Sequence, residues 1–267
     1  MATPALSPVA SPARFRNLEV LVISLLCLVL PTAAAMYMHS PWRAWFVVAA
    51  SMIVFLLFLG RWISGRPLGV LINERNLMSL SRFQMVSWTV LLLSAFFTIA
   101  LHRLHALAFV SGAKPLDIAM DWRLYALMGI SATSLVGTPL LLNSKTAEPS
   151  DQKTVNKAAF ALNEPAAQIE ANSQGKLYSN SKISDASITD MFQGDEVGNT
   201  AYVDVSKLQM FYFTVIAVIA YTYAIYAAMG TISTPAKFDM PVPPDALVAL
   251  LGISHAAYLT SKTTQHS

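Results

Sequence analysis

Two glutamine residues could place polar chemistry inside an otherwise apolar chain. Gln84 and Gln209 each lie about one helical turn after the start of a long apolar segment. A side-chain amide at that depth needs a hydrogen-bonding partner, because lipid offers none. The pair could line a polar constriction, or it could bond neighbouring helices, which is the commoner use of polar residues in helix bundles. The other residues that could line such a path are Thr89, Thr214, Ser131, Ser254 and His255.

His255 is an ionisable side chain within the last apolar segment, and ionisable residues inside a membrane are often functional. It could relay protons or gate a path. A relay also needs acidic partners, and the last four apolar segments contain no Asp or Glu in their cores. We therefore favour a packing histidine that is hydrogen-bonded to a neighbouring helix, with the relay as the alternative.

A short acidic stretch precedes the fifth apolar segment. Asp195 and Glu196 could give oxygen atoms to a cation, but their spacing matches no calcium loop, so a solvated turn is the better interpretation. Ile188, Met191 and Phe192 follow helical spacing, which predicts a short amphipathic element on the membrane surface or on the protein. The residues expected to dock a cytoplasmic partner are Asp190, Met191, Phe192, Asp195 and Glu196.

The chain has none of the common enzymatic motifs. We find no Walker loop, dinucleotide fingerprint, nucleophile elbow or zinc-binding helix motif. The single cysteine, Cys27, excludes an intrachain disulfide and any multi-cysteine metal site. We therefore expect no catalytic residue, no bound cofactor and no metal.

Composition predicts an all-α membrane protein that spans the bilayer six times. Hydrophobic residues make up 55% of the 267 residues and charged residues only 12%, about half the share in soluble domains. Apolar stretches of about 20 residues are long enough to cross the bilayer as helices, and their unbroken character argues against a barrel. The six predicted spans are 19–38, 44–63, 83–101, 124–142, 208–229 and 246–259.

The basic residues indicate the orientation. More of them flank the spans on the side of the amino terminus, which by the positive-inside rule puts both termini in the cytoplasm. This pattern, without an aromatic-interleaved basic patch, argues against a nucleic-acid partner despite the pI near 9.0. The first span could instead be a cleaved signal peptide, since Arg14 and Arg16 precede it and Ala33 to Ala35 end it.

The chain divides into five predicted parts. They are a disordered cytoplasmic lead at 1–17, an N-terminal hairpin at 18–63, a first repeat unit at 64–145, a flexible cytoplasmic loop at 146–187, and a second repeat unit at 188–267.

An internal duplication relates the two repeat units. A shift of 125 positions superposes the motif S-[RK]-x-Q-M-x-x-[WF]-T at Ser81 and at Ser206, and a shift of 123 superposes L-x-G-I-S at Leu127 and at Leu250. The order is the same, so two helical hairpins form a parallel repeat about a pseudo-twofold axis along the membrane normal. We expect Ser79 and Asp204 to cap the entering helices, whereas Arg82 and Lys207 should reach lipid phosphates.

Small residues recur every four positions in both returning helices. This spacing allows close helix packing, within one chain or between subunits of a homo-oligomer. The residues are Gly129, Thr133, Gly137, Gly252, Ala256 and Thr260.

At the level of S-x-S-R-x-Q-M-x-x-W-T followed by L-x-G-I-S, the chain resembles a group of uncharacterised bacterial membrane proteins. The resemblance covers the last four spans and implies a bacterial inner-membrane protein without a particular activity. Two function classes are therefore compared. The first is a non-enzymatic scaffold or anchor that docks a cytoplasmic partner through the inner-face loop; the second is a channel or small transporter with its path at the pseudo-twofold axis.

Overall fold

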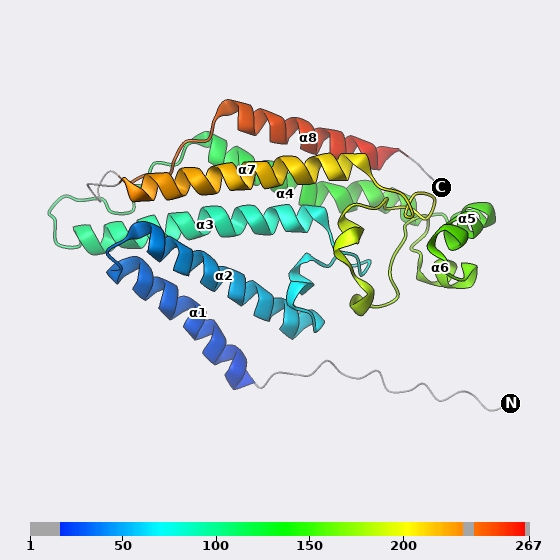
Figure 1. The fold of residues 1–267 in the computed structure, drawn as a ribbon, viewed down its shortest axis with the longest axis horizontal. Coiled ribbons are helices and arrows are strands. Elements are labelled where there is room, and N and C mark those ends of the chain that lie inside the picture. The colour runs from blue at the N-terminus through cyan, green and yellow to red at the C-terminus, as the bar shows by residue number, and fades with distance from the viewer. Residues whose placement is uncertain (1–16, 232–237, 265–267) are drawn as a thin grey trace.

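A computed structural model describes residues 17–231 and 238–264. Within these residues the protein is all-α, with six long helices, of which the first two run obliquely to the others (Figure 1). They are α1 (Asn17–Tyr37), α2 (Pro41–Ser64), α3 (Leu80–Leu107), α4 (Trp122–Asn143), α7 (Val205–Gly230) and α8 (Asp245–Thr263). The predicted disordered lead lies almost wholly outside the described residues.

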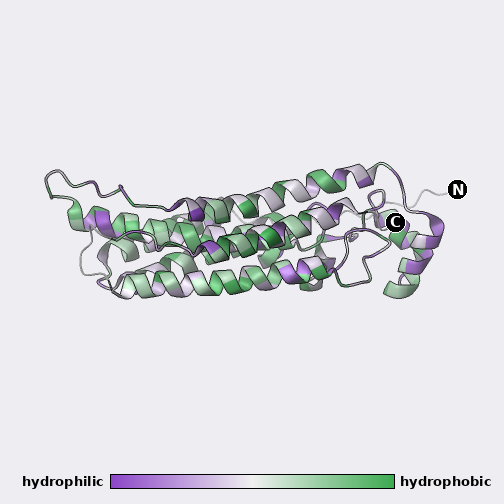
Figure 2. Cartoon of the chain, turned by 90° about the horizontal axis from the view of Figure 1, so that it is seen from above, coloured by the Kyte–Doolittle hydropathy of each residue, from purple (hydrophilic) through white to green (hydrophobic). Residues whose placement is uncertain are grey.

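Five of these helices are long and apolar enough to cross a membrane, as in a multi-pass membrane protein. They are α1, α2, α3, α4 and α7. The helix α8 is not among them, because its 19 residues include Asp245, His255 and Lys262, which lower its mean hydropathy. Figure 2 shows hydrophobic residues along the long helices and more hydrophilic ones in the small helices at one end.

Local capping explains where the central helices begin. The Ser79 side chain accepts a hydrogen bond from the Arg82 backbone N–H at the start of α3. The Asp204 carboxylate accepts from the Ser206 and Lys207 N–H groups at the start of α7. Both residues satisfy backbone donors that the first helical turn leaves free, so the capping prediction is confirmed.

The apolar core lies around α3, which packs against α1, α2, α4 and α7. Trp88 and Ile99 of α3 are buried with Leu127 of α4 and Tyr221 of α7. The helix α2 joins this core through Trp45, whose indole N–H donates to the Ser94 hydroxyl over 2.9 Å. By contrast, α1 exposes many of its leucine and valine residues, as expected of a helix that faces lipid.

The four helices α3, α4, α7 and α8 alternate in direction. In Figure 1, α3 and α7 run one way, whereas α4 and α8 return the other way. The returning helices α4 and α8 pack against each other, and α3 contacts α7. The starts of α3 and α7 and the ends of α4 and α8 therefore meet at one end of the bundle, which we call the polar end.

The segment that was expected to be a flexible loop contains folded elements at the polar end. It forms α5 (Gln152–Leu162), α6 (Ala166–Asn172) and the 3-10 turn η3 (Ile183–Asp185). The 3-10 turn η4 (Ile188–Met191) follows it, where the sequence predicts a short amphipathic element. Val155, Ala158 and Ala159 of α5 pack with Ile169 of α6 in a small cluster of their own. The sequence did not predict this cluster because the segment is mostly polar, and the few apolar residues of α5 lie on one face of the helix. A further 3-10 turn, η1 (Pro67–Leu71), lies between α2 and α3.

Candidate functional site

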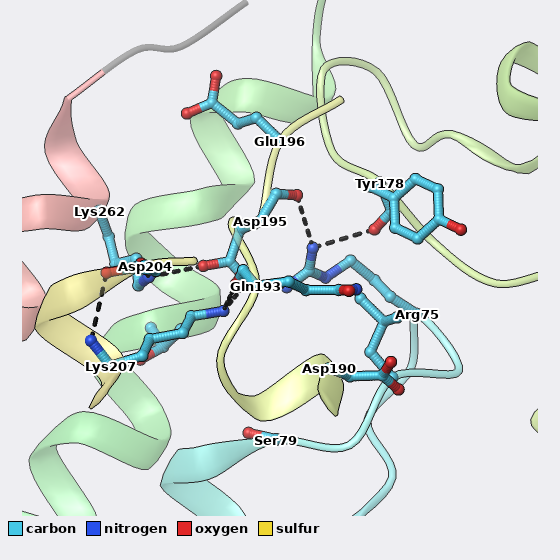
Figure 3. Close-up of polar contacts among 12 residues, drawn as sticks. Arg75, Ser79, Tyr178, Asp190, Gln193, Asp195, Glu196, Asp204, Lys207 and Lys262 are labelled. Carbon is cyan, nitrogen blue, oxygen red and sulfur yellow. Dashed lines mark hydrogen bonds and ion pairs between the residues drawn. The ribbon is translucent and has the colours of Figure 1, made fainter. Parts of the chain in front are cut away.

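A buried network of charged side chains holds the polar end together. Asp195 lies at its centre, between Arg75 on one side and Lys207 and Lys262 on the other (Figure 3). One carboxylate oxygen is 2.6 Å from the Arg75 guanidinium and 3.2 Å from the Lys207 ammonium, and the other is 2.7 Å from the Lys262 ammonium. The four side chains are each at most 10% exposed, so these ion pairs are shielded from water.

Arg75 is positioned by a tight turn between η1 and α3. The Asn73 side-chain oxygen accepts from the backbone N–H groups of Arg75 and Leu77, and Asn76 adopts a left-handed backbone with φ of 55°. The guanidinium also donates to the carbonyl oxygens of Tyr178 and Asp195, over 3.1 and 3.0 Å. One arginine thus ties the segment before α3 to the segment before α7.

The start of α7 and the end of α8 are joined by Asp204. Its carboxylate caps α7 and also lies 2.9 Å from the Lys262 ammonium in the last turn of α8. Lys207, one turn into α7, donates to the Gln193 carbonyl oxygen over 2.6 Å. The ammonium groups of Lys207 and Lys262 therefore both have partners in the segment before α7.

A second buried ion pair extends the network to α4. The Lys145 ammonium, just after α4, is 2.6 Å from the Glu196 carboxylate and also donates to the Thr264 carbonyl oxygen. The adjacent Asp190 is buried and accepts from the backbone N–H groups of Met78 and Ser187, over 3.0 and 2.8 Å. The network thus joins the segment before α3, the start of α7 and the ends of α4 and α8.

The surroundings set the ionisation of the acids in opposite directions. Burial alone would raise the pKa of Asp195, but Lys207, Lys262 and Arg75 outweigh it and hold the pKa well below its usual range. At Asp204, burial is likewise outweighed, by Lys262 and the Ser206 hydroxyl, so its pKa is lowered. Burial dominates at Asp190 and raises its pKa. Asp195 and Asp204 are therefore ionised at neutral pH.

The residues predicted for the polar path do not share one surface. The Gln84 amide donates to the Thr214 hydroxyl across α3 and α7, and both side chains are fully buried. Gln209 is exposed on α7, and Thr89 is half-buried. Ser131 and Ser254 are buried on α4 and α8. His255 Nδ1 lies 2.5 Å from the Ser134 hydroxyl, which is the helix-bridging arrangement favoured for this histidine.

The predicted close-packing stripe lies at the edge of the α4–α8 contact. Gly137 faces Leu259, and Gly252 faces Ile130. The other four residues of the stripe are exposed, namely Gly129, Thr133, Ala256 and Thr260. Packing within one chain is therefore the wrong explanation for these four, and contact between subunits stays a prediction. Buried residues such as Ser131, Ser134 and Ser254 lie on the inner faces of the two helices.

The docking prediction for the acidic stretch needs correction. Asp190, Met191, Asp195 and Glu196 are all buried within the chain, and Phe192 is half-buried against Phe211. Asp195 and Glu196 do not form a solvated turn, because lysine and arginine side chains surround them. Their role is internal, and they offer no surface to a partner.

The prediction for Lys207 is also wrong. Lys207 turns into the protein rather than toward lipid phosphates, because Asp195 and the Gln193 carbonyl oxygen bind its ammonium. Arg82, its counterpart on α3, remains partly exposed and pairs with Glu74. The only signal for the network in the sequence is a set of acids at 190–204 together with lysines at the ends of spans, and such lysines are also explained by membrane orientation and lipid contact.

Two cavities open at the polar end. The α7–α8 cavity, of about 390 Å³, lies between the start of α7 and the end of α8 and is lined by Asp204, Ser206, Ser261 and Lys262. The α3–α4 cavity, of about 540 Å³, lies between the start of α3 and the end of α4. Leu142 lines both, so the end of α4 separates them.

Comparisons of the chain with protein-family models, with curated proteins and with solved structures found no match. Across the described parts of the chain, no group of three or more His, Cys, Asp or Glu side chains is arranged to hold a metal ion. The features of the described residues that bear on function are therefore the charge network and the two cavities of the polar end.

Proposed function

We propose that the chain is an integral membrane scaffold or anchor that presents a folded polar segment to a cytoplasmic partner. The observation that carries this proposal is the buried charge network, which ties the segment after α4 to the starts of α3 and α7 and to the end of α8. A segment fixed at so many points moves little relative to the bundle. Such rigidity suits a docking platform.

The platform that we propose is the outer face of α5. Phe160 is 91% exposed there. Lys153 and Lys157 are exposed on the same helix. An exposed aromatic residue near basic side chains suits a partner with an apolar pocket and an acidic rim.

We further propose six spans, with both termini in the cytoplasm of a bacterium and the protein in the inner membrane. Support for α8 as the sixth span comes from its packing against α4 and α7. Its charged residues Asp245 and Lys262 lie at its two ends, so the turns between them contain no Asp, Glu, Lys or Arg. The positive-inside pattern and the resemblance to bacterial membrane proteins support the orientation and the location.

The duplication is part of the proposal, and contacts at corresponding positions support it. The Ser81 and Thr138 hydroxyls lie 3.5 Å apart between α3 and α4, and the Ser206 and Ser261 hydroxyls lie 2.9 Å apart between α7 and α8. The shifts of 125 and 123 positions relate these two pairs. Ser79 and Asp204, which cap the two entering helices, also correspond.

The channel alternative receives less support. The most suitable polar side chains for a path, Gln84 and Thr214, are hydrogen-bonded to each other and buried. Gln209, which should face the same axis, is on the outside of α7. We also propose no catalytic activity, because the polar side chains of the network are engaged in ion pairs.

Mass spectrometry of the protein extracted in mild detergent tests the scaffold. We expect a partner in a fixed ratio that is lost in Phe160→Ser and retained in Phe109→Ser, a matched control because Phe109 is fully exposed at the other end of the bundle. Solute flux into liposomes forms the second arm. Flux that Gln84→Met abolishes, together with no stoichiometric partner, would overturn the scaffold in favour of a channel.

A further inference from the structure

The α3–α4 cavity changes from polar to apolar along its depth. Its residues nearest the polar end include Asn73, Glu74, Arg82 and Gln174. One to two turns further along the helices, the wall is mainly apolar, with Met85, Val86, Leu135 and Pro139 beside the single hydroxyl of Thr138. Because α3 and α4 are candidate membrane spans, this gradient runs from the membrane surface toward its hydrocarbon interior. An amphiphilic molecule, with a polar head and an apolar tail, changes from polar to apolar along its length in the same way.

Pro139 contributes to the space beside α4. Proline has no N–H to donate to the carbonyl oxygen four residues earlier, and its ring crowds that carbonyl. In α4 the affected carbonyl belongs to Leu135, and both residues line the cavity. The helix therefore lacks one of its regular hydrogen bonds where the cavity is apolar.

The lining of the corresponding α7–α8 cavity includes charged residues that are paired within the chain. The shift of 123 positions relates Pro139 to Lys262, which is buried in ion pairs with Asp195 and Asp204. Lys207, the counterpart of Arg82, is also buried and paired with Asp195. The charged lining of the α7–α8 cavity is thus used in internal ion pairs, whereas the α3–α4 cavity is larger and its Arg82 pairs only with the exposed Glu74.

Arg82 is the cation at the α3–α4 cavity that a ligand can engage. Arg75 also lines the cavity, but it is buried and bound to Asp195. The Arg82 side chain is 31% exposed, and its partner Glu74 is 77% exposed. An exposed ion pair contributes only about 0–1 kcal/mol, so an anionic ligand can displace Glu74 easily. Asp195 compensates the charge of Arg75, so a ligand that displaces Glu74 meets the one positive charge of Arg82.

We propose that the α3–α4 cavity binds an anionic glycerophospholipid of the surrounding membrane. The phosphate contacts Arg82 and the amides of the polar rim, and the first acyl carbons lie against Met85, Val86 and Leu135. The exposed Val136 and Leu140 of α4 carry the rest of the chain into the bilayer. Charge complementarity and the polar-to-apolar lining select this occupant over a soluble anion, which would leave the apolar wall uncovered. This inference does not depend on the scaffold role.

Native mass spectrometry of the full chain, stripped of lipid in detergent and titrated with defined lipids, tests the proposal. We expect one phosphatidylglycerol to bind at least about tenfold more tightly than phosphatidylcholine, as one charge-assisted contact allows. Arg82→Gln should abolish that preference. Arg61→Gln is the matched control, because Arg61 is exposed at the end of α2 and does not line the cavity.

Two further variants keep the test independent of folding defects. Glu74→Gln removes the competing carboxylate and should increase phosphatidylglycerol binding severalfold, a gain that misfolding cannot produce. Leu135→Trp fills the apolar wall and should weaken phosphatidylglycerol binding while Arg82 is unchanged. Glycerol 3-phosphate forms the soluble-anion arm. Binding of glycerol 3-phosphate as tight as that of the lipid, or equal phosphatidylglycerol binding by wild type and Arg82→Gln, would overturn the proposal.

Discussion

Lys145 and Glu196 form an ion pair of 2.6 Å across 51 residues of sequence, with side chains only 4% and 2% exposed. The lysine follows α4, and the glutamate precedes α7. The pair therefore fixes both ends of the polar segment that contains α5 and α6. Because both charges are out of water, loss of either one leaves the other buried without the opposite charge of this pair.

Removal of the lysine charge should therefore be costly. We expect Lys145→Met to lower the free energy of unfolding by about 3–5 kcal/mol, since the Glu196 carboxylate stays buried. The double variant Lys145→Met with Glu196→Gln should recover part of that loss. Chemical unfolding in mixed micelles measures both, and Lys153→Met, at an exposed lysine of α5, is the control. A double variant no more stable than the single one would argue against direct coupling.

Asp195 is expected to be the most sensitive acid of the chain's polar end. Asp195→Asn keeps the shape of the side chain but leaves Arg75, Lys207 and Lys262 with one negative charge fewer. We expect a loss of about 3–5 kcal/mol in the free energy of unfolding. Asp185→Asn, at an exposed aspartate of η3, should change it by less than about 0.5 kcal/mol. Equal losses in the two variants would contradict the central role of Asp195.

Acid should weaken the network in a defined pH range. The pKa values of Asp195 and Asp204 are lowered in the folded protein, whereas an unfolded aspartate titrates near about 3.9. Their stabilisation is therefore complete above pH ~4 and is lost as the pH falls through the lower folded-state values. The free energy of unfolding, measured in micelles from pH 6 downward, should fall below that point. The slope should be smaller in Asp195→Asn, and an unchanged slope would rule this origin out.

The Gln84–Thr214 hydrogen bond should stabilise the contact between α3 and α7. Gln84→Met preserves the volume and removes the amide, and we expect a loss of about 0.6–2 kcal/mol, as is usual for one hydrogen bond between membrane helices. Gln209→Met, on the exposed side of α7, should be neutral. Thermal unfolding in detergent compares the two variants. If Gln209→Met costs as much as Gln84→Met, the assignment of a buried interhelical bond to Gln84 is incorrect.

Hydropathy predicted where most of the long helices lie, and capping residues predicted where α3 and α7 begin. Apolar runs predicted the five candidate spans because each must bury its backbone polar groups within one helix. Ser79 and Asp204 were predictable as caps from a short oxygen acceptor just before a helix. The helix α5 was not predicted. Val155, Ala158 and Ala159 follow helical spacing, but the polar composition of the surrounding residues is also typical of a flexible loop.

The charge network could not be predicted in the same way. Arg75, Asp195 and Lys262 belong to three distant segments, and an ion pair across such separations has no periodicity in sequence. The positive-inside rule already explains a lysine at the end of a span, so no single lysine indicates an ion pair. Only the arrangement of α3, α7 and α8 brings their charges into contact.

The position of Lys262 in the last turn of α8 has a consequence for biogenesis. Asp195 and Asp204 leave the ribosome well before Lys262 does, so during synthesis these acids lack one of their cations. The segment between α4 and α7 therefore reaches its final packing only after α8 has joined the bundle. We therefore expect this segment to be more sensitive to proteases in a chain that ends before α8 than in the full chain.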